Sequence, residues 1–166
     1  MKDALISRRE FLKDIGILGA GVLLSASPWL SVFSEVTKTS NEKCRLAIIG
    51  PGSRGRFLMS FLVQNPKVDI VALCDIYQPS IDRGLELAPK AKVYKDYRRI
   101  LEDKEIDAVL VATPLNSHCQ IVLDAFDAGK HVFCEKSIGF TMEECFRIYS
   151  KHVSTGKIFF TGQQRL

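Results

Sequence analysis

The chain carries Gly50-Pro51-Gly52-Ser53-Arg54-Gly55 between a short apolar run at residues 45–49 and a segment of helical period. Glycines suit such a junction because the backbone must turn tightly, approach a pyrophosphate closely and let helix and strand pack. The helix start then offers N–H groups and the positive end of its dipole to the phosphates. The pattern predicts a dinucleotide-binding loop with candidate contacts at Gly50, Gly52, Ser53, Arg54 and Gly55. Arg54 would hold phosphate or reach substrate; the alternative is a solvated residue of the first helical turn.

Six short apolar runs alternate with segments of helical period along the rest of the chain. They cover residues 45–49, 69–74, 92–94, 107–112, 131–134 and 158–161. Their β-branched composition predicts strands that are buried on both faces and therefore parallel. Repeated strand and helix with right-handed crossovers give an α/β fold, a doubly wound parallel sheet of the Rossmann dinucleotide-binding type.

Periodic apolar positions and end signals locate the helices between these strands. Three stripes are expected to face the core: Leu58, Phe61 and Leu62; Cys119, Val122, Leu123 and Phe126; and Met142, Cys145, Phe146, Tyr149 and Val153. Thr141 to Glu144 form a capping-box pattern that starts the last helix. Gly129 and Gly156 follow helical segments as expected C-terminal caps.

Length and charge restrict the classes of function. The 166 residues allow one domain and a tail, assigned here to 41–166 and 1–40. The formal charge is +4, with 23 Lys and Arg against 19 Asp and Glu. The basic residues are spread along the chain and form no cluster that would bind nucleic acid. The five cysteines form neither a C-x-x-C pair nor a Cys/His cluster, so no metal site or disulfide framework is predicted.

The amino-terminal segment has the layout of an export signal. Ser7-Arg8-Arg9-Glu10-Phe11-Leu12-Lys13 resembles the twin-arginine signal, and a short apolar run follows at 15–24. Ten apolar residues are too few to span a bilayer, which needs about 20, so no stable membrane anchor is predicted. We expect residues 1–40 to be signal and linker, cleaved after Ala26 or slightly later, for a periplasmic or otherwise exported protein that meets the twin-arginine machinery. The alternative is an amphipathic or buried amino-terminal helix.

Asp75 ends the second predicted strand, 20 residues after Gly55. A carboxylate at this place accepts hydrogen bonds from the adenosine ribose hydroxyls. It also repels the extra phosphate of NADP, and no Lys or Arg follows until Arg83, so the sequence predicts NAD and disfavours NADP. The alternative for Asp75 is a helix cap.

The fourth predicted strand leads into a loop that contains Thr113, Pro114 and His118. Ligands of a doubly wound sheet lie beyond the carboxyl ends of the strands, so this loop is expected to face the cofactor. Asn116 or Ser117 is expected to cap the next helix. A lone histidine is most often a polar surface residue, and for His118 we favour packing or contact with the cofactor over a general base.

The fifth predicted strand ends in Cys134-Glu135-Lys136-Ser137. A lysine at this position would hydrogen-bond a substrate hydroxyl, and its charge would favour the alkoxide that precedes hydride loss. Lys136 is therefore the catalytic candidate, and a structural salt bridge between Lys136 and Glu135 is the alternative.

Taken together, these loops resemble the amino-terminal half of the glucose–fructose oxidoreductase, inositol dehydrogenase and related (Gfo/Idh/MocA) family. The most specific match is the phrase at residues 128–136, for which the family carries A-G-K-H-V-x-x-E-K-P. The resemblance runs from Cys44 through Gly162-Gln163-Gln164-Arg165 and implies cofactor contacts at Thr113, Pro114, His118, Glu135 and Lys136, with the lysine beside the nicotinamide. Ser137 departs from the family's proline.

The resemblance also implies what the protein does. We expect the NAD-binding part of an exported oxidoreductase that acts on a CH–OH group of a sugar or polyol. One alternative is an NAD-dependent glycosidase that oxidises its sugar transiently, and another is a dinucleotide-binding module without catalysis. The family continues into a second α/β domain that binds substrate and often pairs subunits, so a full-length form is expected to be a homo-oligomer. Nothing in the 166 residues corresponds to that domain.

Overall fold

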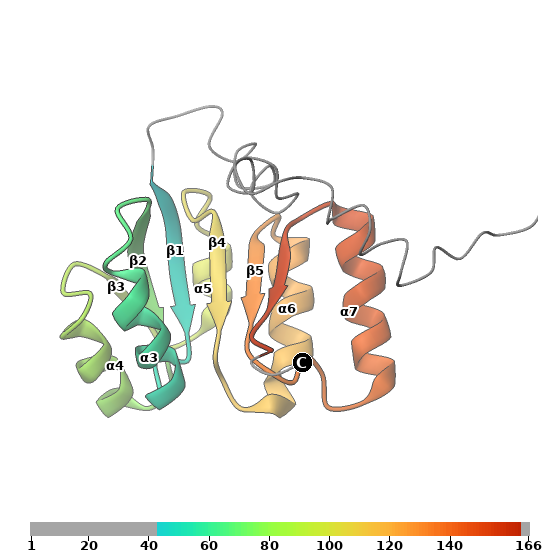
Figure 1. Ribbon diagram of the computed structural model, residues 1–166, viewed down its shortest axis with the longest axis horizontal. Coiled ribbons are helices and arrows are strands. Elements are labelled where there is room, and N and C mark those ends of the chain that lie inside the picture. The colour runs from blue at the N-terminus through green and yellow to red at the C-terminus, as the bar shows by residue number, and fades with distance from the viewer. Residues whose placement is uncertain (1–42, 164–166) are drawn as a thin grey trace, which may run out of the picture. The chain divides into compact units, whose positions relative to one another are not determined.

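In the computed structural model, residues 43–163 are described, and they form one six-stranded sheet with helices on both faces (Figure 1). The strands are β1 (Cys44–Ile49), β2 (Val68–Cys74), β3 (Lys92–Tyr94), β4 (Ala108–Val111), β5 (His131–Cys134) and β6 (Phe159–Thr161). The helices are α3 (Ser53–Leu62), α4 (Gln78–Leu85), α5 (Tyr97–Leu101), α6 (His118–Asp127) and α7 (Met142–Thr155), with a 3-10 turn η1 (Leu115–Ser117). The six predicted strands are confirmed, with ends that differ by one residue at most. The predicted signal and linker at 1–40 lie outside the described residues.

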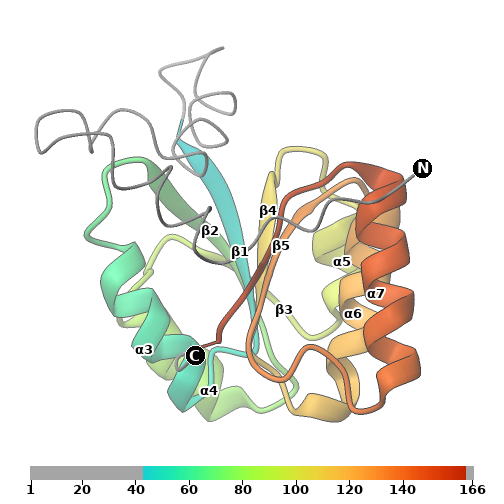
Figure 2. The same cartoon turned by 45° about the vertical axis from the view of Figure 1, so that its right-hand side comes forward.

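The strand order is β3-β2-β1-β4-β5-β6, and every neighbouring pair is parallel. From β1 the chain moves outward to β2 and β3, with α3 and α4 on one face. From β4 it moves the opposite way to β5 and β6, and α5, α6 and α7 cover the other face (Figure 2). The predicted doubly wound sheet is thus confirmed. Its direction reverses between β1 and β4, and the carboxyl ends beside this switch point are where such sheets bind ligands.

Alternate residues of the central strand β1 contribute to two hydrophobic cores. Ala47 and Ile49 belong to the core that includes Phe126 of α6, whereas Leu46 and Ile48 belong to the core that includes Met59 of α3. This alternation follows from the two-residue repeat of a strand, and it holds the sheet between the two helical layers. The prediction of burial on both faces is wrong for the edge strands β3 and β6, because their side chains are not fully covered by the helices that pack on the sheet. On β6, for example, Phe160 is 61% exposed.

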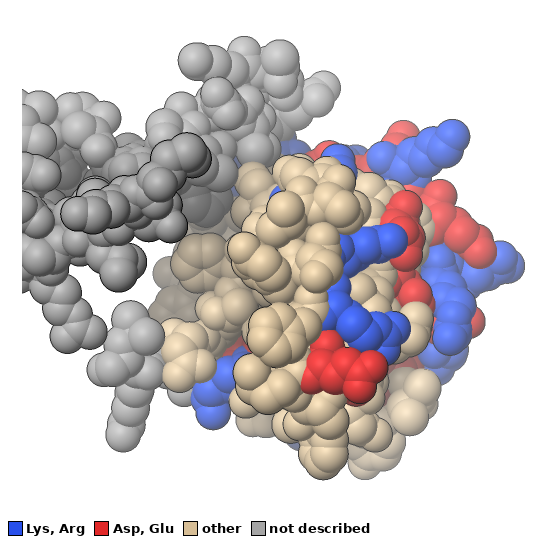
Figure 3. Space-filling view, turned by 90° about the vertical axis from the view of Figure 1, so that its right-hand side faces the viewer, with Lys and Arg blue, Asp and Glu red and all other residues tan. Residues whose placement is uncertain are grey.

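Helix α7 contradicts the predicted core stripe. Its buried residue is Ile148, whereas Met142, Phe146, Tyr149 and Val153 are each more than 60% exposed. Each residue turns a helix by about 100°, so two apolar sets can coexist on different sides of α7, and periodicity alone does not say which set packs. Figure 3 looks onto the side of the molecule where α7 lies and shows an uncharged area bordered by charged side chains.

The same correction applies to one position of α3. Phe61, predicted in its core stripe, is 60% exposed, while Met59 is the residue that is fully buried. Phe61 instead lies edge-on against Phe57, with ring centroids 5.1 Å apart. Leu58 and Leu62 of the predicted stripe do pack against the core that includes Met59, so the prediction is wrong at Phe61 alone.

Three predicted helix ends are confirmed: the start of α7 and the ends of α6 and α7. Thr141 Oγ1 accepts a hydrogen bond from the Glu144 N–H at 3.2 Å, and the Glu144 carboxylate accepts in return from the Thr141 N–H. Gly156 ends α7 with φ +63°, and Gly129 follows α6 with φ +72°. A positive φ is the conformation for which glycine is favoured at a helix end.

All five cysteines lie in the described part and carry free thiols. Burial raises the pKa of Cys134 to about 12 and that of Cys74 to about 11. Neither thiol therefore ionises near neutral pH, and both serve as small apolar groups of the core. Among residues 43–163 no group of three metal-ligating side chains is found, and no helix is long and apolar enough to cross a membrane.

Candidate functional site

The glycine loop lies at the switch point, between β1 and α3. The structure gives a different reason for glycine at each of its three glycine positions. Gly50 has φ +89°, and a Cβ there would lie 2.8 Å from the Ala112 carbonyl. A Cβ on Gly55 would lie only 2.3 Å from the Gly50 oxygen. A Cβ on Gly52 would meet nothing within 4 Å, so the fold does not need a glycine there. The open space beside Gly52 fits a phosphate that approaches the backbone closely.

The start of α3 is suited to an anion. Its N-cap, Gly52, provides no side-chain hydrogen bond, and its first turn contains no acidic residue. Neither the N-cap nor an acidic side chain of the first turn competes with an anion there, and the positive end of the dipole faces the loop. Ser53 is the first residue of this turn and Arg54 the second, so the five predicted loop residues lie in the loop and first turn that begin α3.

Asp75 directly follows β2, one strand outward from the loop. Its backbone N–H donates to Tyr94 O at 3.3 Å, and its Oδ1 accepts from the Tyr77 N–H at 2.9 Å. Tyr77 is the N-cap of α4, so Asp75 fixes the residue before the helix and does not cap the helix itself. The next residues, Ile76 and Tyr77, are 87% and 60% exposed. Sequence reasoning missed this apolar pair; two large apolar residues beside the acid were the available signal.

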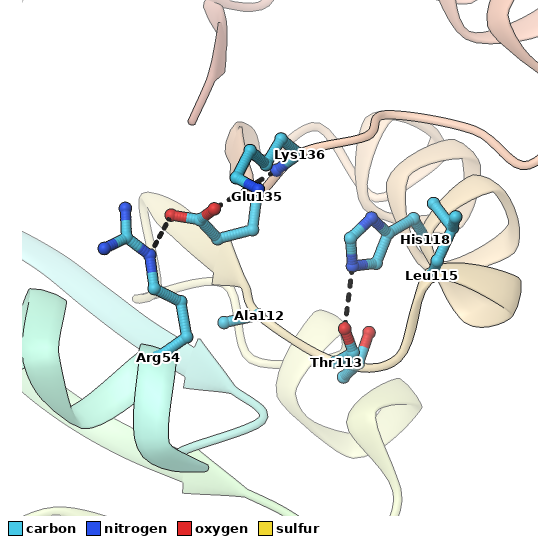
Figure 4. A pocket seen from close by; sticks show the side chains of 7 residues that line it. All are labelled: Arg54, Ala112, Thr113, Leu115, His118, Glu135 and Lys136. Carbon is cyan, nitrogen blue, oxygen red and sulfur yellow. Dashed lines mark hydrogen bonds and ion pairs between the residues drawn. The ribbon is translucent and has the colours of Figure 1, made fainter. Parts of the chain in front are cut away.

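A cavity of 360 Å³ opens at the carboxyl ends of β4 and β5 (Figure 4). Its lining residues come from the loops after β1, β4 and β5: Arg54, Ala112, Thr113, Leu115, His118, Glu135 and Lys136. Five of the predicted site residues therefore meet around one cavity. Asp75 lies outside this group, on the other side of the glycine loop, as expected for the opposite half of an extended dinucleotide.

His118 is 1% exposed, which is unusual for a lone histidine and agrees with the packing role that we favour for it. Its Nδ1 lies 2.7 Å from Ser137 O and its Nε2 lies 2.8 Å from Thr113 O. A neutral imidazole has one N–H and donates to one of these carbonyls, whereas an imidazolium donates to both. With both nitrogens engaged, His118 joins the loops after β4 and β5, which favours packing over general-base chemistry.

Ser117 precedes α6 but does not cap it with its side chain, contrary to the prediction. Its Oγ lies 2.8 Å from Thr113 Oγ1 and 2.7 Å from Pro114 O. These contacts hold the turn at Thr113 and Pro114 instead of the helix N–H groups. The 3-10 turn η1 places Ser117 close to this loop, which periodicity could not indicate.

Glu135 is 5% exposed, and its carboxylate has two partners. Oε1 accepts from Arg54 Nε at 2.7 Å, and Oε2 accepts from the Lys136 backbone N–H at 3.2 Å. Within residues 43–163 no ion pair joins Glu135 to the Lys136 side chain, so the salt bridge weighed from the sequence is replaced by one to Arg54. Lys136 is exposed and lines the cavity, and the Lys136–Ser137 peptide bond is cis.

Lys130, the other lysine of the 128–136 phrase, is structural. It is 4% exposed, and its Nζ donates to Asp103 O at 2.5 Å and to Ile106 O at 2.8 Å. Burial lowers its pKa, and the negative charge of Asp103 acts in the opposite direction by raising it. Lys130 thus ties the turn before β4 to the turn before β5, at the edge of the sheet away from the cavity.

Comparison with known proteins shows the family. Residues 44–163 match the Gfo/Idh/MocA oxidoreductase family, described as having an NAD-binding Rossmann fold. The chain belongs to the Gfo/Idh/MocA family. Its described part is therefore an NAD-binding domain, and NAD is the cofactor.

Individual relatives of this Gfo/Idh/MocA domain fall into two groups. A glycosyl hydrolase family 109 protein of Stenotrophomonas maltophilia is 34% identical over 91% of the chain and 34% of its own length. An alpha-N-acetylgalactosaminidase of Shewanella oneidensis is 31% identical over 92% of the chain and 38% of its own length. Myo-inositol dehydrogenase of Lactobacillus casei, solved with NAD(H) and myo-inositol, is 31% identical with a TM-score of 0.69, over 72% of the chain and 36% of that protein. The chain thus spans about a third of the length of these relatives.

Proposed function

We propose that this chain is the NAD-binding part of an exported oxidoreductase that acts on a CH–OH group of a sugar or polyol. The observation that carries the proposal is Lys136, an exposed cation on a cavity beside the loop that fits a pyrophosphate. A carbinol substrate needs a donor at its hydroxyl and a place for the departing hydride. The relative solved with NAD(H) and myo-inositol supports a polyol as the class of substrate.

Each predicted residue has a place in this scheme. Gly50, Gly52, Ser53 and Gly55 would hold the pyrophosphate at the start of α3, with the cation Arg54 in the same turn, and Asp75 would accept from the adenosine ribose hydroxyls. Thr113 and Pro114 would contact the nicotinamide half, and His118 keeps their loop against the loop of Lys136. NAD, when bound, supplies the hydride acceptor.

Lys136 acts on the substrate in two ways. Its ammonium group donates a hydrogen bond to the reacting oxygen. Its positive charge favours the alkoxide that remains when a base takes the hydroxyl proton, before the hydride passes to NAD and the carbonyl forms. The Glu135 carboxylate accepts a hydrogen bond from the backbone N–H of Lys136, which fixes the position of the Lys136 backbone. Because Glu135 is buried, this hydrogen bond is shielded from water.

Replacement of Lys136 tests the proposal in the intact enzyme. Lys136→Met is expected to keep NAD affinity near the wild-type value, measured by titration calorimetry, and to abolish substrate turnover. Lys136→Arg, which keeps the charge but not the shape, is the matched comparison and is expected to retain part of the activity. Unchanged turnover in Lys136→Met would remove the catalytic role.

A second function is favoured by the relatives named glycosyl hydrolase family 109 protein and alpha-N-acetylgalactosaminidase. An NAD-dependent glycosidase would oxidise its sugar transiently, eliminate the glycosidic substituent and regenerate NAD in each turnover. The two functions differ in net redox change. A dehydrogenase accumulates NADH at 340 nm in proportion to product, whereas the glycosidase releases its leaving group with no net NADH.

Export is a separate proposal that rests on the residues before the described part. Ser7 to Lys13 resemble the twin-arginine signal, and a short apolar run follows. Such a route carries folded proteins, which suits a domain that must acquire NAD before it leaves the cytoplasm. Changing Arg8 and Arg9 to lysine is expected to retain the protein in the cytoplasm on fractionation. Normal export of that variant would contradict the proposal.

A further inference from the structure

The buried carboxylate of Glu135 is the point where three loops meet. Arg54 comes from the turn after β1, Lys136 follows β5, and Gly162 follows β6. The first two contacts are hydrogen bonds, and the third is close packing of the carboxylate against the Gly162 backbone. No sequence pattern assigned a role to Gly162 beyond membership of the segment after the last strand.

Gly162 is buried, and no side chain fits on it as long as Glu135 keeps its position. A Cβ there would lie 2.7 Å from Glu135 Cδ and 2.8 Å from each carboxylate oxygen. The Gly162 N–H donates to Cys134 O at 2.8 Å, which fixes the glycine on β5. The side chain of Glu135 is therefore the part that has to move when a methyl group is added.

The Arg54–Glu135 ion pair crosses the switch point of the sheet. Because β4 lies between β1 and β5, an interaction between the loops after β1 and β5 passes over the end of β4, where Ala112 lies between the two side chains (Figure 4). Arg54 is also held from a second side, with its Cζ 5.0 Å from the centroid of the Phe57 ring. The guanidinium is thus oriented before any ligand binds.

An oriented arginine binds an anion more tightly than a mobile one. A free arginine side chain loses rotamer freedom when it is ordered on binding, and a preorganised one has lost it already. Arg54 belongs to the first turn of α3, next to the space that fits the pyrophosphate. Its orientation by Glu135 therefore contributes to the affinity for the dinucleotide.

We propose that Gly162 is a positioning residue of the NAD site, which acts by seating the Glu135 carboxylate so that it holds Arg54 beside the pyrophosphate. The inference rests on NAD binding by this domain and is independent of the proposed sugar chemistry. Gly162→Ala displaces the carboxylate, releases Arg54 and weakens NAD binding, although Gly162 itself need not touch the cofactor.

The test is titration calorimetry with NAD on the 166-residue chain. Gly162→Ala and Arg54→Met are each expected to raise the dissociation constant about 10-fold, the size associated with a charge-assisted hydrogen bond. The double variant is expected to bind NAD no more weakly than the weaker-binding single variant, because both changes remove the same oriented cation. The loss of NAD affinity in Gly162→Ala is also expected to be smaller in high salt, because it comes from an attraction between charges that salt screens.

Three results would overturn the proposal. They are wild-type affinity in Gly162→Ala, wild-type affinity in Arg54→Met, and losses that add in full in the double variant. Glu135→Gln, which keeps the shape and removes the charge, provides the same test if Gly162→Ala does not fold, and it is expected to weaken NAD binding to a similar extent. The affinity of the unchanged chain in the same titration reports on NAD binding itself.

Discussion

Two glycine-to-alanine changes, three residues apart in one loop, separate the demands of the fold from those of the cofactor. A Cβ on Gly55 would lie 2.3 Å from the backbone oxygen of Gly50, and backbone cannot move aside as a side chain can. Overpacking of this kind costs 1–3 kcal/mol, and contact with a fixed carbonyl puts Gly55→Ala at about 3 kcal/mol. For a domain of this size 1 kcal/mol corresponds to about 3–5 °C in Tm, so the variant is expected to melt about 10 °C lower.

Gly52→Ala is expected to behave in the opposite way. Gly52 has φ −66° and ψ −164°, which alanine adopts freely, and its Cβ would meet no atom within 4 Å. The poorer capping by alanine and the reduced entropy of the unfolded chain nearly cancel, so stability changes by less than about 1 kcal/mol. NAD affinity is expected to fall at least 10-fold, or about 1.4 kcal/mol, because the methyl group occupies the space that a phosphate needs.

Differential scanning fluorimetry and NAD calorimetry on both variants make the comparison. The reasoning is refuted if Gly52→Ala loses as much thermal stability as Gly55→Ala, or if it binds NAD as well as the unchanged chain. The first result would mean that the fold itself requires Gly52. The second would mean that the pyrophosphate does not approach the loop at this residue.

Three further changes test other parts of the molecule. Calorimetry is expected to show that NAD binds more tightly than NADP. Asp75→Ala is expected to reduce the ratio of the two dissociation constants about 10-fold, because the carboxylate repels the additional phosphate of NADP. Burial, with a smaller contribution from the charge of Lys157, lowers the pKa of His131, whose Nδ1 accepts a hydrogen bond from the Ile158 N–H at 3.0 Å. As the pH falls through about 6.5, the unfolded chain therefore binds a proton at His131 before the folded chain does. The Tm is expected to drop between about pH 7 and 5, and to drop less in His131→Gln. Thr141→Ala removes one side of a capping box and is expected to cost about 1 kcal/mol, seen as a Tm lower by about 3–5 °C, and an unchanged Tm would show that the cap adds nothing.

Local rules were sufficient for most of the fold. A strand of β-branched residues, a glycine turn and a helix recur in the sequence, and handedness leaves essentially one way to wind them into a parallel sheet. The capping box at Thr141 and the left-handed Gly156 were equally predictable, because both depend on residues within one helical turn. The loops after β1, β2, β4 and β5 met at one edge of the sheet as predicted, since parallel strands place their carboxyl ends together.

Which face of a helix is buried could not be predicted in the same way. Met142, Phe146 and Tyr149 satisfy the period of a core stripe, yet Ile148 is the residue that α7 buries. Periodicity reports that a helix has an apolar side, whereas the angle at which it docks on the sheet determines which apolar side is used. That angle depends on α6, against which α7 packs and which lies elsewhere in the chain.

The sequence by itself determined the doubly wound parallel sheet, the position of the glycine loop and NAD as the cofactor, because each follows from residues that are close together along the chain or from the handedness of the backbone. Only the tertiary structure decided the partners of Glu135 and His118. Glu135 pairs with Arg54, 81 positions away, and not with its neighbour Lys136, while His118 is buried between two loops. The physical reason is that a buried polar group bonds to whatever donor or acceptor the packed fold places within about 3 Å, and that distance is set by the docking of whole elements.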